Sequence, residues 1–119
     1  MPGGPTVTTL TKRADFLAAA RALRRGTPAF GLQARQRHDD SPAIRVGFTC
    51  SKKVGNAVAR NRAKRRLRAA VRAVLAQHGR PGWDYVLIGR KDTTAALPFA
   101  QLTSDLARAL GQIHPAPRA

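Results

Sequence analysis

The chain has 119 residues, 43% of them hydrophobic, which is enough for one globular domain with a single modest core. Lysine and arginine total 22 against six acidic residues, so the formal net charge is +16. This excess predicts a polyanionic partner, either nucleic acid or an anionic membrane surface, and composition does not decide between RNA and DNA. A membrane surface is disfavoured because the apolar side of the helix that carries Arg60 lacks the Trp or Phe of an interfacial helix. No apolar run is long enough to span a bilayer and no signal-peptide pattern is present, so we expect a cytoplasmic protein without a membrane partner. The single Cys50 fits a reducing compartment.

The N-terminal part of the chain predicts a flexible leader and then a helix. Residues 1–8 contain two prolines and two glycines and show no packing pattern. A helix is predicted over 12–25, capped by Thr11 and ended by Gly26. Its inward positions are predicted to be Phe16, Leu17, Ala20 and Leu23.

Two strands are predicted next. Residues 29–37 alternate apolar and polar side chains, which is typical of a half-buried strand. Residues 44–51 alternate in the same way, and the polar turn 38–43 separates the two segments. Because this link is short, we expect the two strands to form an antiparallel hairpin.

The segment 57–77 predicts a long amphipathic helix that ends near Gly79. At about 100° per residue, one sector is apolar and consists of Ala63, Leu67, Ala70, Val71 and Val74. The opposite sector consists of Arg60, Asn61, Lys64, Arg65, Arg68 and Arg72. Like charges four residues apart weaken a helix, so this cationic sector predicts a polyanion that neutralises it.

The rest of the chain predicts a central strand and a final helix. Residues 85–88 form a continuous apolar run, and Pro98 opens a helix. The buried stripe of that helix is predicted to be Phe99, Leu102, Leu106, Leu110 and Ile113. The order α-β-β-α-β-α predicts an α+β fold, a single two-layer α-β sandwich with a small mixed sheet. It occupies residues 9–113, and the tail 114–119 is predicted to be frayed.

No catalytic or metal site is predicted. The six acidic residues are all aspartates in separate elements, apart from Asp39 and Asp40 in a polar turn. The three histidines and Cys50 have no spacing suited to a metal. Cys50 shares a strand face with apolar residues, which predicts a buried small side chain. Glycine-rich phosphate loops are absent. The sequence therefore predicts a binder.

Residues 51–68, SKKVGNAVARNRAKRRLR, closely resemble the signature of the bacterial ribonuclease P protein subunit, with Arg60-Asn61-Arg62 as its distinctive part. The resemblance extends to Asp15-Phe16, to Arg45-Val46-Gly47 and to Gly89-Arg90-Lys91, and covers about residues 9–112. It implies an α-β sandwich with a left-handed β-α-β crossover. It also implies a role in removing the 5′ leader of precursor tRNA, with the hydrolysis carried out by a catalytic RNA and Mg²⁺ held mainly by that RNA.

The resemblance further implies a role for individual residues. The catalytic RNA would contact Lys52, Lys53, Arg60, Asn61, Arg62, Lys64, Arg65 and Arg68. The leader would lie in a cleft between the first helix and the sheet, near Phe16, Gln33, Arg35 and Thr49. One protein would bind one RNA, and no protein side chain would be catalytic.

Two departures from the family pattern weaken the predicted leader contacts. The N-terminal arm is rich in proline and glycine rather than strongly basic, and Ala20 and Gln33 stand where aromatic residues are common in the family. The sequence leaves open whether Phe16 packs in the core or stacks on bases. It also leaves two rival interpretations, a ribosomal protein and a DNA-binding module. The second would need a helix-turn-helix pair or a dimerising element, and neither is visible.

Overall fold

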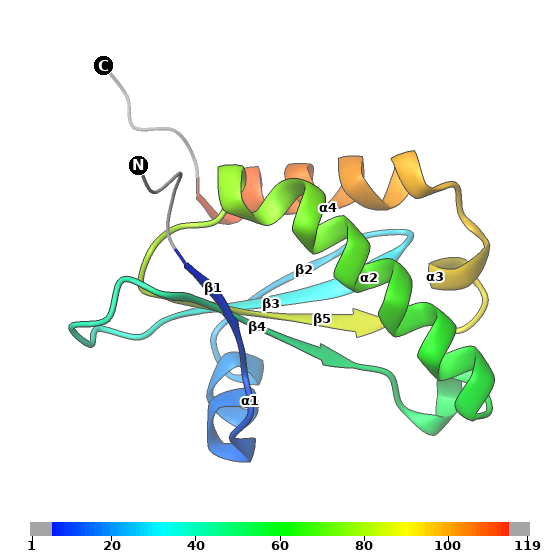
Figure 1. Cartoon of the computed structure of the whole chain (residues 1–119), viewed down its shortest axis with the longest axis horizontal. Coiled ribbons are helices and arrows are strands. Elements are labelled where there is room, and N and C mark those ends of the chain that lie inside the picture. The colour runs from blue at the N-terminus through cyan, green and yellow to red at the C-terminus, as the bar shows by residue number, and fades with distance from the viewer. Residues whose placement is uncertain (1–5, 115–119) are drawn as a thin grey trace.

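The computed structural model describes residues 6–114, which form a mixed sheet with helices on both faces (Figure 1). The elements in chain order are β1 (Val7–Thr9), α1 (Arg13–Ala20), β2 (Leu23–Gly26), β3 (Phe30–Gln36), β4 (Ile44–Thr49), the 3-10 turn η1 (Lys52–Val54), α2 (Ala57–His78), β5 (Trp83–Gly89), α3 (Thr93–Ala96) and α4 (Phe99–Ile113). The predicted α+β class and mixed sheet are confirmed. The flexibility predicted for residues 1–5 and 115–119 lies outside the described residues.

The sheet has the strand order β1-β4-β5-β3-β2. The predicted hairpin of 29–37 with 44–51 is wrong, because β5 lies between β3 and β4, antiparallel to the first and parallel to the second. The apolar β5 is buried at residues 84–87 and takes the centre, where both of its edges are paired. Parallel neighbours need a long crossover, and α2 supplies it between β4 and β5. This β-α-β connection matches the one that the resemblance implies, and its left hand stays a prediction.

The predicted helix 12–25 is too long. It ends at Ala20, and Leu23–Gly26 becomes the edge strand β2, antiparallel to β3. Leu17 and Leu23, predicted to point inward, are 46% and 44% exposed. The N-cap is Lys12, without a side-chain hydrogen bond, rather than Thr11. A short apolar pattern is compatible with either a helix or a strand. Residues 23–26 form a strand because they pair with β3.

The predicted flexible leader 1–8 is wrong at its C-terminal end. Val7–Thr9 forms β1, a parallel partner of β4, and the Ile44 amide donates to the Thr6 carbonyl at 2.9 Å. All three β1 side chains are exposed, so burial could not have marked this strand in the sequence. Its pairing covers the open edge of β4.

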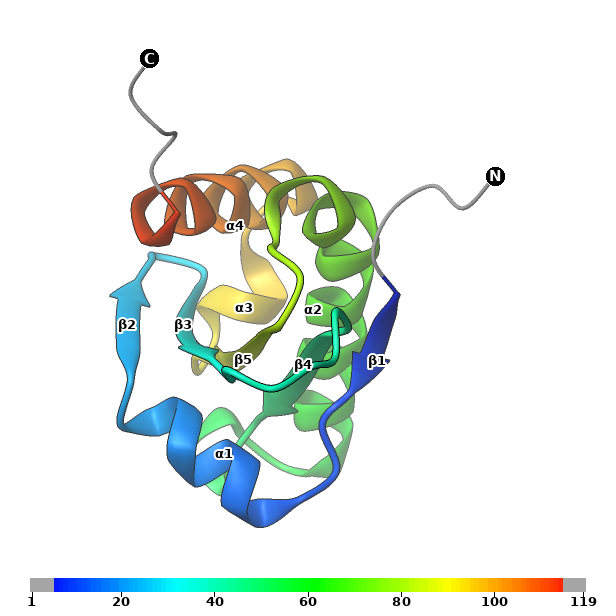
Figure 2. The ribbon, with the colours of Figure 1, turned by 90° about the vertical axis from the view of Figure 1, so that its left-hand side faces the viewer.

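The main core lies between one face of the sheet and the helices α2 and α4 (Figure 2). The predicted apolar stripe of α2 is buried throughout, and Leu75 extends it. The stripe of α4 is confirmed except at Phe99, which is 42% exposed because it is the first helical residue. On the other face, Ala19 of α1 packs with Leu10 and Val86 in a smaller cluster.

The C-terminal tail was predicted to fray from His114, but the structure buries His114 to 8% exposure. The Tyr85 hydroxyl lies 2.6 Å from its Nε2 and accepts from the Arg80 amide at 2.9 Å. Burial, reinforced by the charge of Arg80, lowers the pKa of His114 to about 4. This pair fastens the end of α4 to β5.

Candidate nucleic-acid interface

The predicted cationic sector of α2 forms one continuous surface, here called the basic face: Arg60, Asn61, Lys64, Arg65, Arg68 and Arg72. Within residues 6–114 none of its arginines or its lysine takes part in an ion pair. Arg68 lies over the Phe48 ring, 5.5 Å from its centroid. Because the segment from Arg45 to Arg72 contains no acidic residue, the positive charge of this helix is not neutralised locally.

Another arginine of the same helix has a structural role. The Arg66 guanidinium donates to the Thr94 carbonyl at 3.1 Å and to the Leu97 carbonyl. It therefore ties α2 to the segment around α3. Arg66 therefore binds within the fold, whereas the cations of the basic face form no ion pair within residues 6–114.

The start of α2 is defined by specific local contacts. The Asn56 side chain accepts a hydrogen bond from the Ala59 amide at 3.0 Å, which caps the helix. Gly55 has φ +143°, and a Cβ there would lie 2.8 Å from Ala59 Cβ, so glycine is required. The preceding turn η1 places Lys52 and Lys53 exposed beside the helix N-terminus. The predicted RNA-contacting residues are thus brought together on and beside α2.

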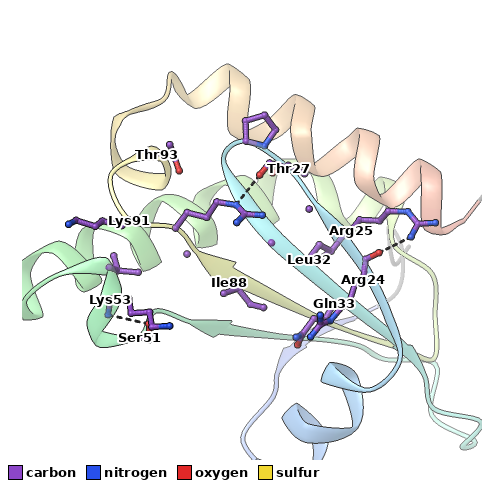
Figure 3. A pocket seen from close by; sticks show the side chains of 16 residues that line it. Arg24, Arg25, Thr27, Leu32, Gln33, Ser51, Lys53, Ile88, Lys91 and Thr93 are labelled. Carbon is purple, nitrogen blue, oxygen red and sulfur yellow. Dashed lines mark hydrogen bonds between the residues drawn. The ribbon is translucent and has the colours of Figure 1, made fainter.

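The sheet face that carries α1 is partly open and forms a groove of about 910 Å³. Ile88 lies in its middle, with Ser51 and Lys53 on one side and Gln33 and Arg24 on the other (Figure 3). The lining contains no acidic residue. Its five cations are Arg24, Arg25, Lys53, Arg90 and Lys91. An apolar floor with cationic walls suits single-stranded nucleic acid, whose phosphates and bases need both kinds of contact.

The four residues predicted on the leader side occupy different places. Gln33 lines the groove. Thr49 is exposed on β4 and pairs with the groove residue Ile88. Phe16 is half-buried in the α1 cluster and covers Gly47 so closely that a Cβ there would lie 2.4 Å from its ring. Phe16 is therefore a packing residue that is partly exposed, and its contact with the leader stays a prediction.

Arg35, the fourth of these residues, belongs to a buried ion cluster. Asp84 has no exposed side-chain surface and accepts from Arg37 at 2.9 Å and from Arg45 Nε and Nη2 at 2.7 Å each. Arg35 lies 3.6 Å from Asp84 and 3.5 Å from Asp15. Hydrogen bonding to Asp84 raises the pKa of Arg45. These arginines are neutralised within the fold, unlike those of α2.

The described residues hold no group of three or more histidine, cysteine or acidic side chains that could bind a metal ion. The buried carboxylate of Asp84 is already surrounded by guanidinium groups, so its oxygens are not available to a cation. Cys50 is half-buried, and burial raises the pKa of its thiol. Within residues 6–114 no helix is both long and apolar enough to cross a membrane.

Sequence reasoning missed the contribution of β2 to the groove. Arg24 and Arg25 were assigned to a helix end, whereas they lie on the edge strand. Arg90 and Lys91 follow β5 and were noted only as part of a resemblance. The sequence does contain a signal, since Arg24-Arg25 and Arg90-Lys91 are both pairs of adjacent basic residues. That signal could be interpreted only after the strand order showed that both pairs line one groove.

Comparisons with known proteins agree with this geometry. The model of the family Ribonuclease P matches residues 5–114. The ribonuclease P protein component of Ruegeria pomeroyi is 62% identical over 109 residues, covering 91% of this chain and 87% of that protein. The corresponding protein of Caulobacter vibrioides is 54% identical over 101 residues, covering 85% and 67%.

Solved structures show the same fold. The RNase P protein of Staphylococcus aureus superposes with a TM-score of 0.72 at 24% identity, covering 89% of this chain and 94% of that one. The protein from Thermotoga maritima gives a TM-score of 0.70 at 25% identity, covering 86% and 93%. The family match spans nearly the whole described structure and includes the basic face, η1 and the groove. The chain belongs to the ribonuclease P protein family.

Proposed function

We propose that this chain is the protein subunit of ribonuclease P and binds the catalytic RNA through the basic face of α2, assisted by Lys52, Lys53 and Arg62. The observation that carries the proposal is the contrast in charge pairing. Arg35 and Arg45 on the sheet are neutralised by Asp15 and Asp84, whereas the cations of the basic face have no acidic partner within residues 6–114. Their counterions are then free to be released when RNA phosphates replace them.

The groove on the open sheet face holds the 5′ leader of precursor tRNA in this proposal. Its cations supply phosphate contacts, which position a strand without reading its sequence. Ile88 and the accessible side of Phe16 offer apolar surface to unpaired bases. Gln33 offers an amide instead of an aromatic ring, so the leader is bound mainly through its backbone.

The chemistry is assigned to the RNA. In this proposal Mg²⁺ would be held mainly by the RNA, where it would supply an activated water and charge stabilisation for the hydrolysis. The carboxylates of Asp15 and Asp84 are paired with arginines, and in this proposal the chain binds and orients the RNA and its substrate. One protein molecule would serve one RNA, in the cytoplasm.

The test is cleavage of precursor tRNA by a bacterial ribonuclease P RNA at low Mg²⁺, with and without this chain. We expect rescue by this chain and none by an unrelated protein of similar size and charge. Absence of rescue with folded protein would refute the subunit role. Co-purification with ribosomes instead of one discrete RNA would favour the ribosomal alternative.

A further inference from the structure

A second hollow, here called the notch, lies between the start of α2 and α3. Its volume is about 570 Å³, within the range of small-ligand sites. It is lined by Val54, Asn56, Val58, Ala59, Arg62, Asp92, Ala95 and Ala96. Val54 also lines the groove, so the two hollows share a wall. Neither the basic face nor the groove accounts for it.

Most residues that line the notch are apolar, and hydrogen bonds fix the position of one of its walls. Val58 is 73% exposed, although it stands on the helix that carries the basic face. The opposite wall, α3, is fixed by the hydrogen bonds of Arg66 and by Thr94, whose hydroxyl donates to the Ala29 carbonyl at 2.6 Å. A preformed apolar wall next to the guanidinium of Arg62 fits a ligand with both an apolar surface and a negative charge.

The polar groups of the notch are of opposite kinds. Within the described residues, the side chains of Arg62 and Asp92 take part in no hydrogen bond or ion pair. A phosphate would be attracted by Arg62 and repelled by Asp92. An acidic side chain beside an RNA-binding helix opposes binding unless it accepts hydrogen bonds from the RNA. The donors that an RNA offers are on its bases and its 2′-hydroxyls.

We propose that the notch binds an unpaired guanine base of the partner RNA, with Asp92 accepting hydrogen bonds from its Watson–Crick edge. Guanine presents two adjacent donors there, N1–H and the N2 amino group, which match the two oxygens of a carboxylate. The other bases place an acceptor next to each donor on that edge, which would repel a carboxylate. The base packs against Val58 and Ala95, and Arg62 contacts the adjoining phosphate. This inference rests on the proposed function.

The test compares Asp92→Asn with Asp40→Asn in binding to a ribonuclease P RNA across a salt series. Both changes remove one negative charge, and Asp40 lies in the exposed turn before β4, away from the notch. Asp92 has φ +67° and ψ −52°, and because asparagine has nearly the same shape as aspartate, we expect the variant to keep the fold. We expect Asp92→Asn to weaken binding about tenfold, since a good bidentate base contact discriminates by that order or more. Asp40→Asn should bind equally well or more tightly.

The salt dependence and a chemical footprint complete the test. The log–log salt slope should be unchanged in Asp92→Asn, because no phosphate contact is lost. A reagent that modifies N1 and N2 of unpaired guanines should find one guanine protected by the unmodified protein and exposed with Asp92→Asn. If Asp92→Asn binds as tightly as Asp40→Asn, or no guanine is protected, the inference is overturned while the subunit role stands.

A second variant probes the apolar wall. Val58→Ala removes exposed surface only, so the free protein should melt as before. We expect severalfold weaker RNA binding with an unchanged salt slope. Unaltered affinity would show that no base packs there. Failure of the unmodified chain to bind the RNA at all would overturn the subunit role together with this inference.

Discussion

Replacing Asp84 by asparagine tests whether the buried ion cluster holds the sheet together. The substitution keeps the side-chain shape but removes the charge that accepts from Arg37 and Arg45 at 2.7–2.9 Å. Asparagine also turns an NH₂ group toward guanidinium donors. Breaking a buried ion pair on one side costs about 3–5 kcal/mol, because the remaining charge stays desolvated without a partner. Typical domains have about 5–15 kcal/mol of total stability.

For a domain of this size, about 4 °C of Tm corresponds to 1 kcal/mol, so we expect Tm to fall by about 12–20 °C. Urea denaturation should show a lower midpoint with an unchanged m value. The matched control is Asp39→Asn, because Asp39 also pairs with Arg37, at 3.0 Å, but its side chain is 49% exposed. The fall in Tm should be much smaller for Asp39→Asn than for Asp84→Asn. Equal midpoints for the two variants would refute the reasoning that burial makes the Asp84 cluster strong.

The remaining predictions concern RNA binding, the leader and pH. Arg60→Ala and Arg62→Ala should each lower the log–log salt slope of RNA binding by about one unit. Arg66→Ala should instead lower Tm, because the Arg66 guanidinium binds backbone carbonyls. Salt slopes equal to that of the unmodified protein in all three variants would remove α2 from the interface. Phe16→Ala should weaken binding of precursor tRNA more than of mature tRNA in the assembled enzyme; an equal loss for both, together with a lower Tm, would assign Phe16 to packing alone. In the folded protein the pKa of His114 is about 4, below its ordinary value of 6.5. Between these two pH values the unfolded chain binds more protons than the folded one. The contribution of His114 to stability is therefore complete above pH 6.5 and is lost as the pH falls toward 4. His114→Gln should flatten this decline in urea titrations, and an unaltered decline would contradict the assignment.

The sequence predicted most of what depends on local periodicity. The apolar and cationic sectors of α2 were identified correctly because a long helix repeats its pattern over many turns. The stripe of α4 repeats in the same way, whereas the central strand β5 was predicted from a continuous apolar run rather than from a repeat. Arg66 shows the limit of this approach, since its charge alone does not distinguish a phosphate contact from a bond to backbone carbonyls.

Strand order and edge strands were outside the reach of local patterns. The short link between β3 and β4 predicted a hairpin, but the insertion of β5 depends on pairing across the α2 crossover. The strands β1 and β2 have exposed side chains and are held by backbone hydrogen bonds to their neighbours. A sequence pattern records which side chains are buried, so strands held only by their backbone leave little trace in it.

The amino-acid sequence by itself determined the family, the basic face of α2 and the expectation of an anionic partner. Tertiary structure alone decided which cations are available to that partner. Arg35 and Arg45 are neutralised because the strand order brings Asp84 between them. Arg24 and Lys91 line one groove because only β3 separates β2 from β5 in the sheet. Charge is a property of composition, but its pairing depends on distance, and distances between remote residues are set by the fold.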